Sequence, residues 1–266
     1  MTHRSTKLAG GFALSLCMTA CASDTTPSGT VPWSNQRTEV VGDGLEFTQL
    51  APASGSACTM YQTECLKPAE KCGTAAVDIV LDSKGKPLDY LCYPSESTLT
   101  VQDLTAQQGT IAQRDNNTVL LLDDLHGGEN VTGPVSIDAN NVVIYGTKPS
   151  AAVLAGSLTI DGNNALVRGL RIQGDVTIAK NDATLAFCVI EGNLTITGNN
   201  FRLLACDVLG TVSITGNNAQ LYADHIAGSL SAQGKNADCK DDFAATDANK
   251  NLTIEAAEVG MPLSCK

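Results

Sequence analysis

Three acid–base side chains lie at related positions late in the sequence. Asp207 and His225 are 18 residues apart, and Glu191 precedes Asp207 by 16 residues. Two carboxyl groups can supply the acid and the base or nucleophile that break a glycosidic bond, and a histidine can exchange protons near neutral pH. The three residues are therefore the candidate catalytic set, provided that the fold stacks successive 18-residue units. The alternative is that they are ordinary charges on a solvated surface.

A second candidate site is the stretch DANKNLTIEAAE at residues 247–258, which resembles the calcium loop of an EF-hand. Oxygen-bearing side chains fill the first, third, fifth, seventh, ninth and twelfth places of that loop: Asp247, Asn249, Asn251, Thr253, Glu255 and Glu258. The sixth place departs from the pattern, because Leu252 stands where the sharp turn needs glycine. The alternative involves no cofactor: the segment is amphipathic and packs Leu252, Ile254 and Val259 onto the end of the fold.

The N-terminus predicts export and a lipid anchor. Residues 1–20 combine two basic residues with a short apolar run, which is typical of a signal peptide. The residues MTAC at 18–21 resemble the lipobox of bacterial lipoproteins, and this resemblance implies that Cys21 carries the lipid. We therefore expect a cell-envelope protein that is attached to the membrane through this anchor. Ordinary secretion, with cleavage near the same point, is the alternative.

The cysteines of the mature chain point to disulfides, because an exported protein meets an oxidising compartment. Four of them lie in residues 58–95, which we expect to form a small stapled hairpin module: Cys58, Cys65, Cys72 and Cys92. In its first strand the alternation places Val77 and Ile79 on the packed face and Val80 on the solvated face. A metal site is the rival interpretation, although the segment has no CxxC pair and no histidine.

The other four cysteines form two candidate pairs. A bond between Cys239 and Cys265 is predicted to lock residues 247–266 as a cap across the end of the fold. Cys188 and Cys206 are 18 residues apart, so in stacked units they lie one above the other at the same inward place. Either they form a strained disulfide, or they are two buried thiols that pack as small apolar side chains.

The positioning element for all these residues is an 18-residue repeat. Counting Ser157 as the first place, glycine closes each unit at Gly174, Gly192, Gly210 and Gly228. Aliphatic residues recur at the second, fourth, eleventh and sixteenth places, and the parity of the pattern changes between them. Three short strands and two bends per unit follow from this pattern, with asparagine at the first bend.

Such a unit cannot bury its apolar residues alone, but stacked units enclose a continuous core. The sequence therefore predicts an all-β fold, a parallel β-helix over residues 99–246. A hexapeptide helix is excluded because the place that should be aliphatic holds Thr184, Arg202 and Gln220. The repeat resembles the right-handed parallel β-helix proteins, a superfamily that includes pectate lyases and many surface proteins. Residues 21–57, which are rich in Ser, Thr, Gly and Pro, are predicted to be a flexible tether.

Charge excludes some partners. The chain carries a net charge of −11, and removal of residues 1–20 makes it −13, with 15 basic and 28 acidic residues. Such a surface repels phosphate groups, so nucleic acid is not an expected partner, and membrane attachment must rest on the lipid.

Two functions fit these observations. The first is a non-enzymatic surface lipoprotein whose rigid β-helix is a scaffold or a binding surface for polysaccharide or protein. The second is a carbohydrate-active enzyme, a polysaccharide lyase or hydrolase, that uses Asp207, Glu191 and His225. Minimal coils leave little chain to build a cleft, and Tyr145 and Tyr222 are the only aromatic residues on the coils expected to stack on sugars. The outward threonine and serine array also resembles β-helical ice-binding proteins, although its second row is broken by Asp161 and Ala179.

Overall fold

The computed structural model of the protein describes residues 49–50, 59–61, 64–66, 76–82, 87–93, 99–122, 131–146, 149 and 152–265. The predicted signal peptide, the lipidation at Cys21 and the tether over 21–57 lie outside the described residues, except for residues 49–50. None of the helices in the described ranges is long and apolar enough to cross a membrane.

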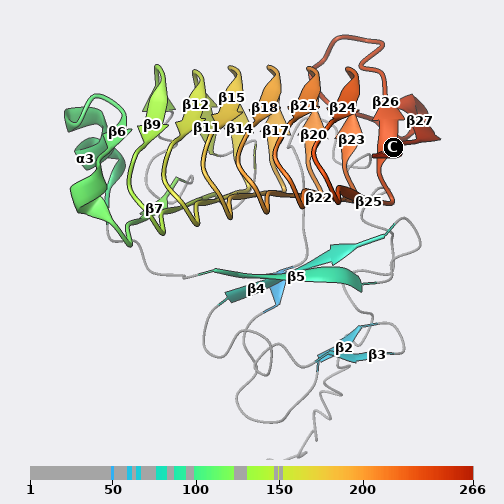
Figure 1. Ribbon diagram of the computed structural model, residues 1–266, viewed down its shortest axis with the longest axis horizontal. Coiled ribbons are helices and arrows are strands. Elements are labelled where there is room, and N and C mark those ends of the chain that lie inside the picture. The colour runs from blue at the N-terminus through green and yellow to red at the C-terminus, as the bar shows by residue number, and fades with distance from the viewer. Residues whose placement is uncertain are drawn as a thin grey trace, which may run out of the picture.

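The body of the molecule is a stack of three-stranded coils (Figure 1). Strands of successive coils pair in parallel and build three long sheets, which we call sheets I, II and III in chain order. Sheet I comprises β6 (Thr110–Ile111), β9 (Val135–Ile137), β12 (Leu158–Ile160), β15 (Val176–Ile178), β18 (Leu194–Ile196), β21 (Val212–Ile214) and β24 (Leu230–Ala232).

The second and third strands of each coil form the other two sheets. Sheet II comprises β7 (Val119–Leu121), β10 (Val143–Tyr145), β13 (Leu166–Arg168), β16 (Thr184–Ala186), β19 (Arg202–Leu204), β22 (Gln220–Tyr222) and β25 (Asp238–Lys240). Sheet III comprises β8 (Val131–Thr132), β11 (Val153–Ala155), β14 (Arg171–Ile172), β17 (Val189–Ile190), β20 (Asp207–Val208), β23 (His225–Ile226), β26 (Phe243–Ala245) and β27 (Val259–Pro262). The predicted parallel β-helix is confirmed.

The core is built from the places that the repeat marked as inward. In the coil that begins at Asn193, the second, fourth, eleventh and sixteenth places are Leu194, Ile196, Leu203 and Val208, and all four are fully buried. Each of them pairs in register with its equivalents in the neighbouring coils. Because a coil buries these side chains only against its neighbours, the stack rather than the single unit is the stable structure.

Asparagine makes the first bend, as predicted. The eighth place has positive φ in every full repeat, including φ 58° at Asn200 and at Asn218, a conformation that asparagine tolerates better than most residues. At the seventh place, the Oδ1 atom of Asn181 accepts hydrogen bonds from the backbone N–H and the side-chain amide of Asn199, at 2.9 and 3.0 Å. These ladders satisfy bend groups that would otherwise lack partners.

The second bend contains residues that the repeat did not single out. The thirteenth place is also left-handed, and it holds Gly169, Phe187, Ala205, Ala223 and Asp241 in successive coils. A left-handed alanine costs roughly 1–2 kcal/mol, so packing must hold these bends. Phe187, Ala205 and Ala223 are buried in an apolar cluster outside the main core.

That cluster is formed with the hairpin that precedes the coils. Strands β4 (Ala76–Leu81) and β5 (Pro87–Tyr93) are antiparallel, with β1 (Gln49–Leu50) beside β4, and they lie against sheet II (Figure 1). Val80 is fully buried in the cluster, together with Leu91, so its predicted place on a solvated face is wrong. The reason is that the hairpin docks on the solenoid. Asp89 also forms an ion pair with Arg202 of β19.

The predicted hairpin is therefore confirmed, and its cysteines are described only in part. Cys92 is disulfide-bonded. Cys65 lies in β3 (Glu64–Leu66), which pairs with β2 (Thr59–Tyr61). Cys58 and Cys72 lie outside the described residues, so the pairing within this group stays a prediction.

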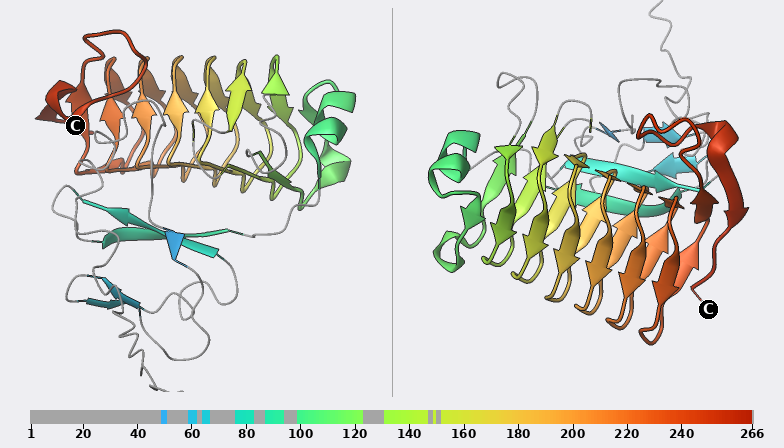
Figure 2. Two further views of the ribbon diagram at one scale, coloured as in Figure 1. Left: turned by 180° about the vertical axis from the view of Figure 1, so that it is seen from behind. Right: turned by 90° about the horizontal axis from the view of Figure 1, so that it is seen from above.

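The two ends of the solenoid are closed differently (Figure 2). At the N-terminal end, helix α3 (Val101–Ala106) begins in a capping box formed by Thr100 and Asp103, and it buries Val101 and Leu104 against the first coils. The repeat pattern did not predict this helix. At the other end, β27 pairs antiparallel with β26, and Cys239 is bonded to Cys265 with their Cα atoms 5.6 Å apart. The predicted disulfide cap is confirmed.

Candidate functional site

The fold brings two of the three candidate catalytic residues into contact. Val189, Asp207 and His225 occupy the fifteenth place of successive coils in sheet III, and Nδ1 of His225 lies 3.0 Å from Oδ1 of Asp207. Asp207 is 3% exposed and His225 is 1% exposed. The expectation that this row faces solvent is therefore wrong, since the row is covered.

The C-terminal segment contacts the same sheet at Arg171. The guanidinium of Arg171, also at the fifteenth place, donates to the backbone oxygen of Leu252 at 3.1 Å and to Glu191 at 2.6 Å. Glu191 is thus held in an ion pair, and the segment around Leu252 lies over the same sheet. The three acid–base residues share a face of the solenoid, but Asp207 and His225 are buried and Glu191 is held in an ion pair with Arg171.

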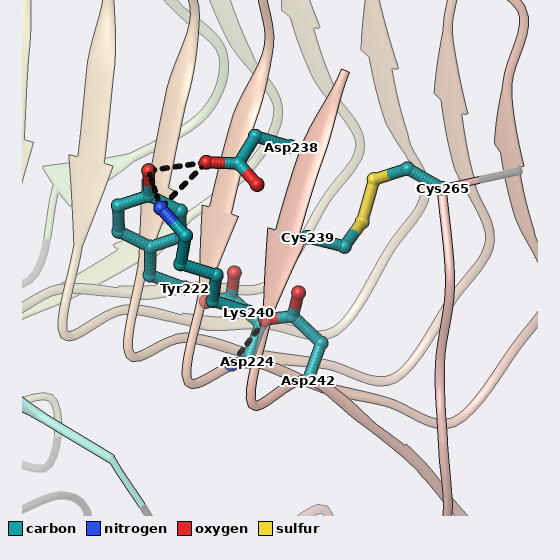
Figure 3. Close-up of a disulfide and its surroundings, with 7 residues drawn as sticks. All are labelled: Tyr222, Asp224, Asp238, Cys239, Lys240, Asp242 and Cys265. Atoms are coloured by element: carbon teal, nitrogen blue, oxygen red, sulfur yellow. Dashed lines mark hydrogen bonds and ion pairs between the residues drawn. A yellow bond between two sulfur atoms is a disulfide. The ribbon is translucent and has the colours of Figure 1, made fainter.

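The tyrosines that were expected to stack on sugars are also covered. Tyr145 and Tyr222 are each 6% exposed. The ammonium of Lys240 lies 4.5 Å from the centre of the Tyr222 ring, and it contacts Asp238 at 2.7 Å (Figure 3). Bonds from Lys240 and Tyr222 lower the pKa of the Asp238 carboxyl, and burial raises the pKa of the Tyr222 hydroxyl. This cluster fastens two coils together on the outer side of sheet II.

In the candidate calcium loop, carboxylates that could bind the ion accept hydrogen bonds from the backbone of the loop itself. The carboxylate of Asp247 accepts the N–H groups of Asn251 and Leu252, at 3.1 and 3.0 Å. Glu258 accepts the N–H group of Ala248 at 2.8 Å. Leu252, the residue that departs from the calcium pattern, has φ 62°, the left-handed conformation that glycine usually supplies.

The alternative account of this segment is confirmed only in part. Ile254 is fully buried, Val259 is half-buried and Leu252 is 40% exposed, so the predicted apolar face is incomplete. Among the described residues, no group of three or more His, Cys, Asp or Glu side chains is arranged to hold a metal ion. The calcium assignment to Asp247, Asn249, Asn251, Thr253 and Glu258 stays a prediction.

A calcium titration tests that prediction. If the loop binds the ion, calcium at ten times its dissociation constant should stabilise the protein by about 1.4 kcal/mol, because only the folded loop presents all the oxygens. The measurement is the melting temperature in millimolar calcium and after chelation, for the wild type and for Glu258→Gln. Equal melting temperatures in the two conditions would end the calcium assignment, and a shift that persists in Glu258→Gln would place the ion elsewhere.

The fourteenth place holds a row of buried side chains that point into the core side of the second bend. Cys188 and Cys206 are fully buried free thiols, so the disulfide alternative for this pair is not realised. The Sγ atom of Cys206 accepts the N–H of Cys188 at 3.4 Å, and burial raises the pKa of the Cys206 thiol well above its ordinary value. The Cys206 thiol therefore remains protonated, and the two buried thiols act as packing groups.

Two carboxyl groups continue this row. Oδ1 of Asp224 accepts the N–H of Cys206 at 2.7 Å. Oδ1 of Asp242 accepts the N–H of Asp224 at 2.9 Å, the bond drawn in Figure 3. Both residues are almost completely buried. Burial, and next the charge of Asp224, raise the pKa of Asp242 to about 10. Asp242 is therefore neutral at physiological pH. Sequence reasoning missed both residues, although the repeat alignment puts them at a place where Leu170 is inward.

Sheet I has an open outer face. The third place of successive coils there holds small hydroxyl side chains that are exposed to solvent: Thr177, Thr195, Ser213 and Ser231. On sheets II and III, by contrast, Leu204 and Asp207 of one coil are buried on the outer side.

The first place of sheet I is ordered by bonds between coils. Asp175 accepts the N–H of Asn193 at 2.7 Å, and Asn193 accepts the hydroxyl of Thr211 at 2.9 Å. Sheet I is thus a regular polar surface with little side-chain freedom.

Comparison with protein-family models, with curated proteins and with solved structures found no match to this chain.

Proposed function

We propose that the protein is a non-enzymatic, lipid-anchored protein of the cell envelope whose sheet I is a rigid binding surface for polysaccharide. The observation that carries the proposal is the contrast between the three sheets. The hairpin lies on sheet II and the C-terminal segment lies over sheet III, whereas the hydroxyl rows of sheet I are exposed.

The surface suits a polar polymer. Its side chains are short, and those of the first place are already fixed by hydrogen bonds, so binding orders few rotamers and loses little entropy. Hydroxyls recur at each coil with the strand spacing of about 4.8 Å, which offers a repeating ligand the same contacts several times. A flat surface without a cleft favours binding over chemistry.

The proposal also includes a lipid anchor at the N-terminus of the mature chain. The signal-like residues 1–20 and the lipobox-like MTAC support export and lipidation at Cys21, and the net charge of −11 does not favour adsorption to anionic lipids. A tether over residues 21–57 would hold the solenoid away from the membrane. A protein partner on the cell surface is the competing occupant of sheet I.

A cosedimentation experiment tests the binding surface. We expect the protein to sediment with insoluble cell-envelope polysaccharide, and we expect Thr195→Arg with Ser213→Arg to weaken that binding at least tenfold, because two long cations disrupt the flat face. Gln102→Arg with Gln113→Arg is the control for charge; Gln102 is exposed on helix α3, and Gln113 is exposed on the first coil. Equal loss in both variants would mean that charge alone acts, and binding only to envelope protein would replace the proposed ligand.

The enzyme remains the competing function, because Asp207 and His225 are in contact. Release of new sugar ends from a polysaccharide by the wild type, and its loss in Asp207→Ala, would overturn the non-enzymatic proposal. Burial of both residues and the ion pair of Glu191 with Arg171 argue against that outcome.

A further inference from the structure

Sheet II is not fully covered by the hairpin, and the part left open is hollowed. A groove of about 350 Å³ crosses three successive coils beside the first bend. It is lined by side chains of the eighth and tenth places: Asp182, Thr184, Asn200, Arg202, Asn218 and Gln220. The hairpin contacts the twelfth and thirteenth places of the same coils, so it lies along one side of the groove.

The side chains that line the groove at the first bend are held in one orientation by hydrogen bonds. The amide of Asn218 donates to Oδ1 of Asn200 at 3.0 Å, and the amide of Asn200 donates to Oδ1 of Asp182 at 2.9 Å. Each amide group has two N–H donors and an oxygen with two lone pairs, and the ladder uses one of each. The ladder therefore leaves each asparagine with a donor and an acceptor to offer to a ligand, in an orientation that is set before binding.

The lining of the groove contains one cation and one anion, and the cation is already neutralised by the hairpin. Arg202 is the cation of the lining, and it is paired with Asp89 of the hairpin, while Asp182 is the anion of the lining. A negatively charged ligand would meet Asp182 and the net negative charge of the whole chain. A positively charged ligand would compete with Arg202 for the carboxylate of Asp89. Uncharged ligands that both donate and accept hydrogen bonds fit this lining.

The lining of the groove repeats from coil to coil, so it fits a ligand whose hydrogen-bonding groups also repeat along an extended chain. Thr184, Arg202 and Gln220 stand at the same place in three adjacent strands, so polar side chains recur along the solenoid axis at about 4.8 Å. Sugar units in an extended glycan recur at a comparable interval and carry hydroxyls that donate and accept. We propose that this groove binds a single extended chain of uncharged sugars, with its axis parallel to that of the solenoid.

This site is separate from sheet I, and the proposal does not depend on the function assigned to that sheet. The probes are uncharged hexasaccharides of glucose, mannose and xylose, with hexagalacturonate as the charged counterpart. Binding to the exported full-length protein is measured by titration calorimetry. The groove variant is Thr184→Val with Gln220→Ala, which keeps the buried shape of Thr184 and removes two polar contacts. The matched control is Thr132→Val with Gln113→Ala, two exposed positions outside both the groove and sheet I.

We expect at least one uncharged hexasaccharide to bind, the groove variant to weaken that binding at least tenfold, and the control variant to leave it unchanged. Circular dichroism must show the same melting temperature for both variants within the error of the measurement. If one is less stable, Asn218→Asp, which adds a charge to the lining, replaces the groove variant and should have the same effect on binding. Failure of every uncharged hexasaccharide to bind, preference for hexagalacturonate, or equal loss in the groove and control variants would overturn the proposal.

Discussion

Replacing both Cys239 and Cys265 by serine is expected to lower the free energy of unfolding by about 3 kcal/mol. The bond spans 26 residues of sequence, and without it the unfolded chain regains the freedom of a loop of that length. In the folded protein it joins the last strand of sheet II to the C-terminal segment, over coils whose core is thin, since Leu230 and Ala232 are only partly buried.

The loss of stability should appear first at the C-terminal end of the solenoid and only later in the rest of the protein. In a stacked fold each coil contacts only its neighbours. An end that has lost its disulfide can therefore unfold while the central coils stay folded. Hydrogen exchange measured by mass spectrometry should speed up first in β24, β25 and β27, whereas β18 in the middle keeps its protection. Comparison of the variant with the wild type under oxidising conditions isolates this bond from that of Cys92. An unchanged unfolding midpoint, or equal exchange in all coils, would contradict the expectation.

Asp242→Asn is expected to stabilise the protein by about 1–3 kcal/mol at pH 8. The wild-type carboxyl must hold a proton to remain buried beside Asp224, and its pKa is about 10 in the folded protein against an ordinary value of 3.8. An asparagine of the same shape needs no proton. Its Oδ1 atom can still accept the N–H of Asp224, which is the bond that Asp242 makes at 2.9 Å.

The contribution of Asp242 to the free energy of unfolding changes with pH in a definite direction. Between about pH 4 and pH 10 the folded protein binds one proton more than the unfolded chain at this position, so the contribution of Asp242 to stability is largest near pH 4 and declines as pH rises. Denaturant unfolding from pH 4 to pH 9 should show this slope in the wild type and a shallower one in Asp242→Asn. Asp241→Asn is the control, because it changes the neighbouring carboxyl to another residue that tolerates φ 58°. Parallel profiles for wild type and Asp242→Asn would refute the assignment.

The stack itself could be predicted because it depends on local repetition. Isoleucine at the fourth place and asparagine at the bend recur at a fixed spacing, and a strand that is displaced by one residue would turn its side chains to the wrong face. Those positions therefore determine the register of all three sheets before any contact between distant segments is known. The same logic placed Asp207 next to His225.

What covers the stack could not be predicted from the repeat. Asp207 is buried although its place in the repeat alternates with the inward places, and Val80 is buried because its hairpin docks on coils that lie far along the chain. Neither burial has a periodic signal. Asp242 is different, since a carboxyl at an inward place of the repeat was visible in the sequence and should have been recognised as a buried acid.

The position of the hairpin also constrains the order in which the protein can form. Asp89 and Arg202 are separated by 113 residues, and the apolar cluster joins Val80 to Tyr222 and Ala223. The hairpin is synthesised first, but the surface on which it docks does not exist until the coil that contains Tyr222 has been added. Val80 and Leu91 must therefore stay exposed while most of the coils are being synthesised, and the folding step that buries them is one of the last.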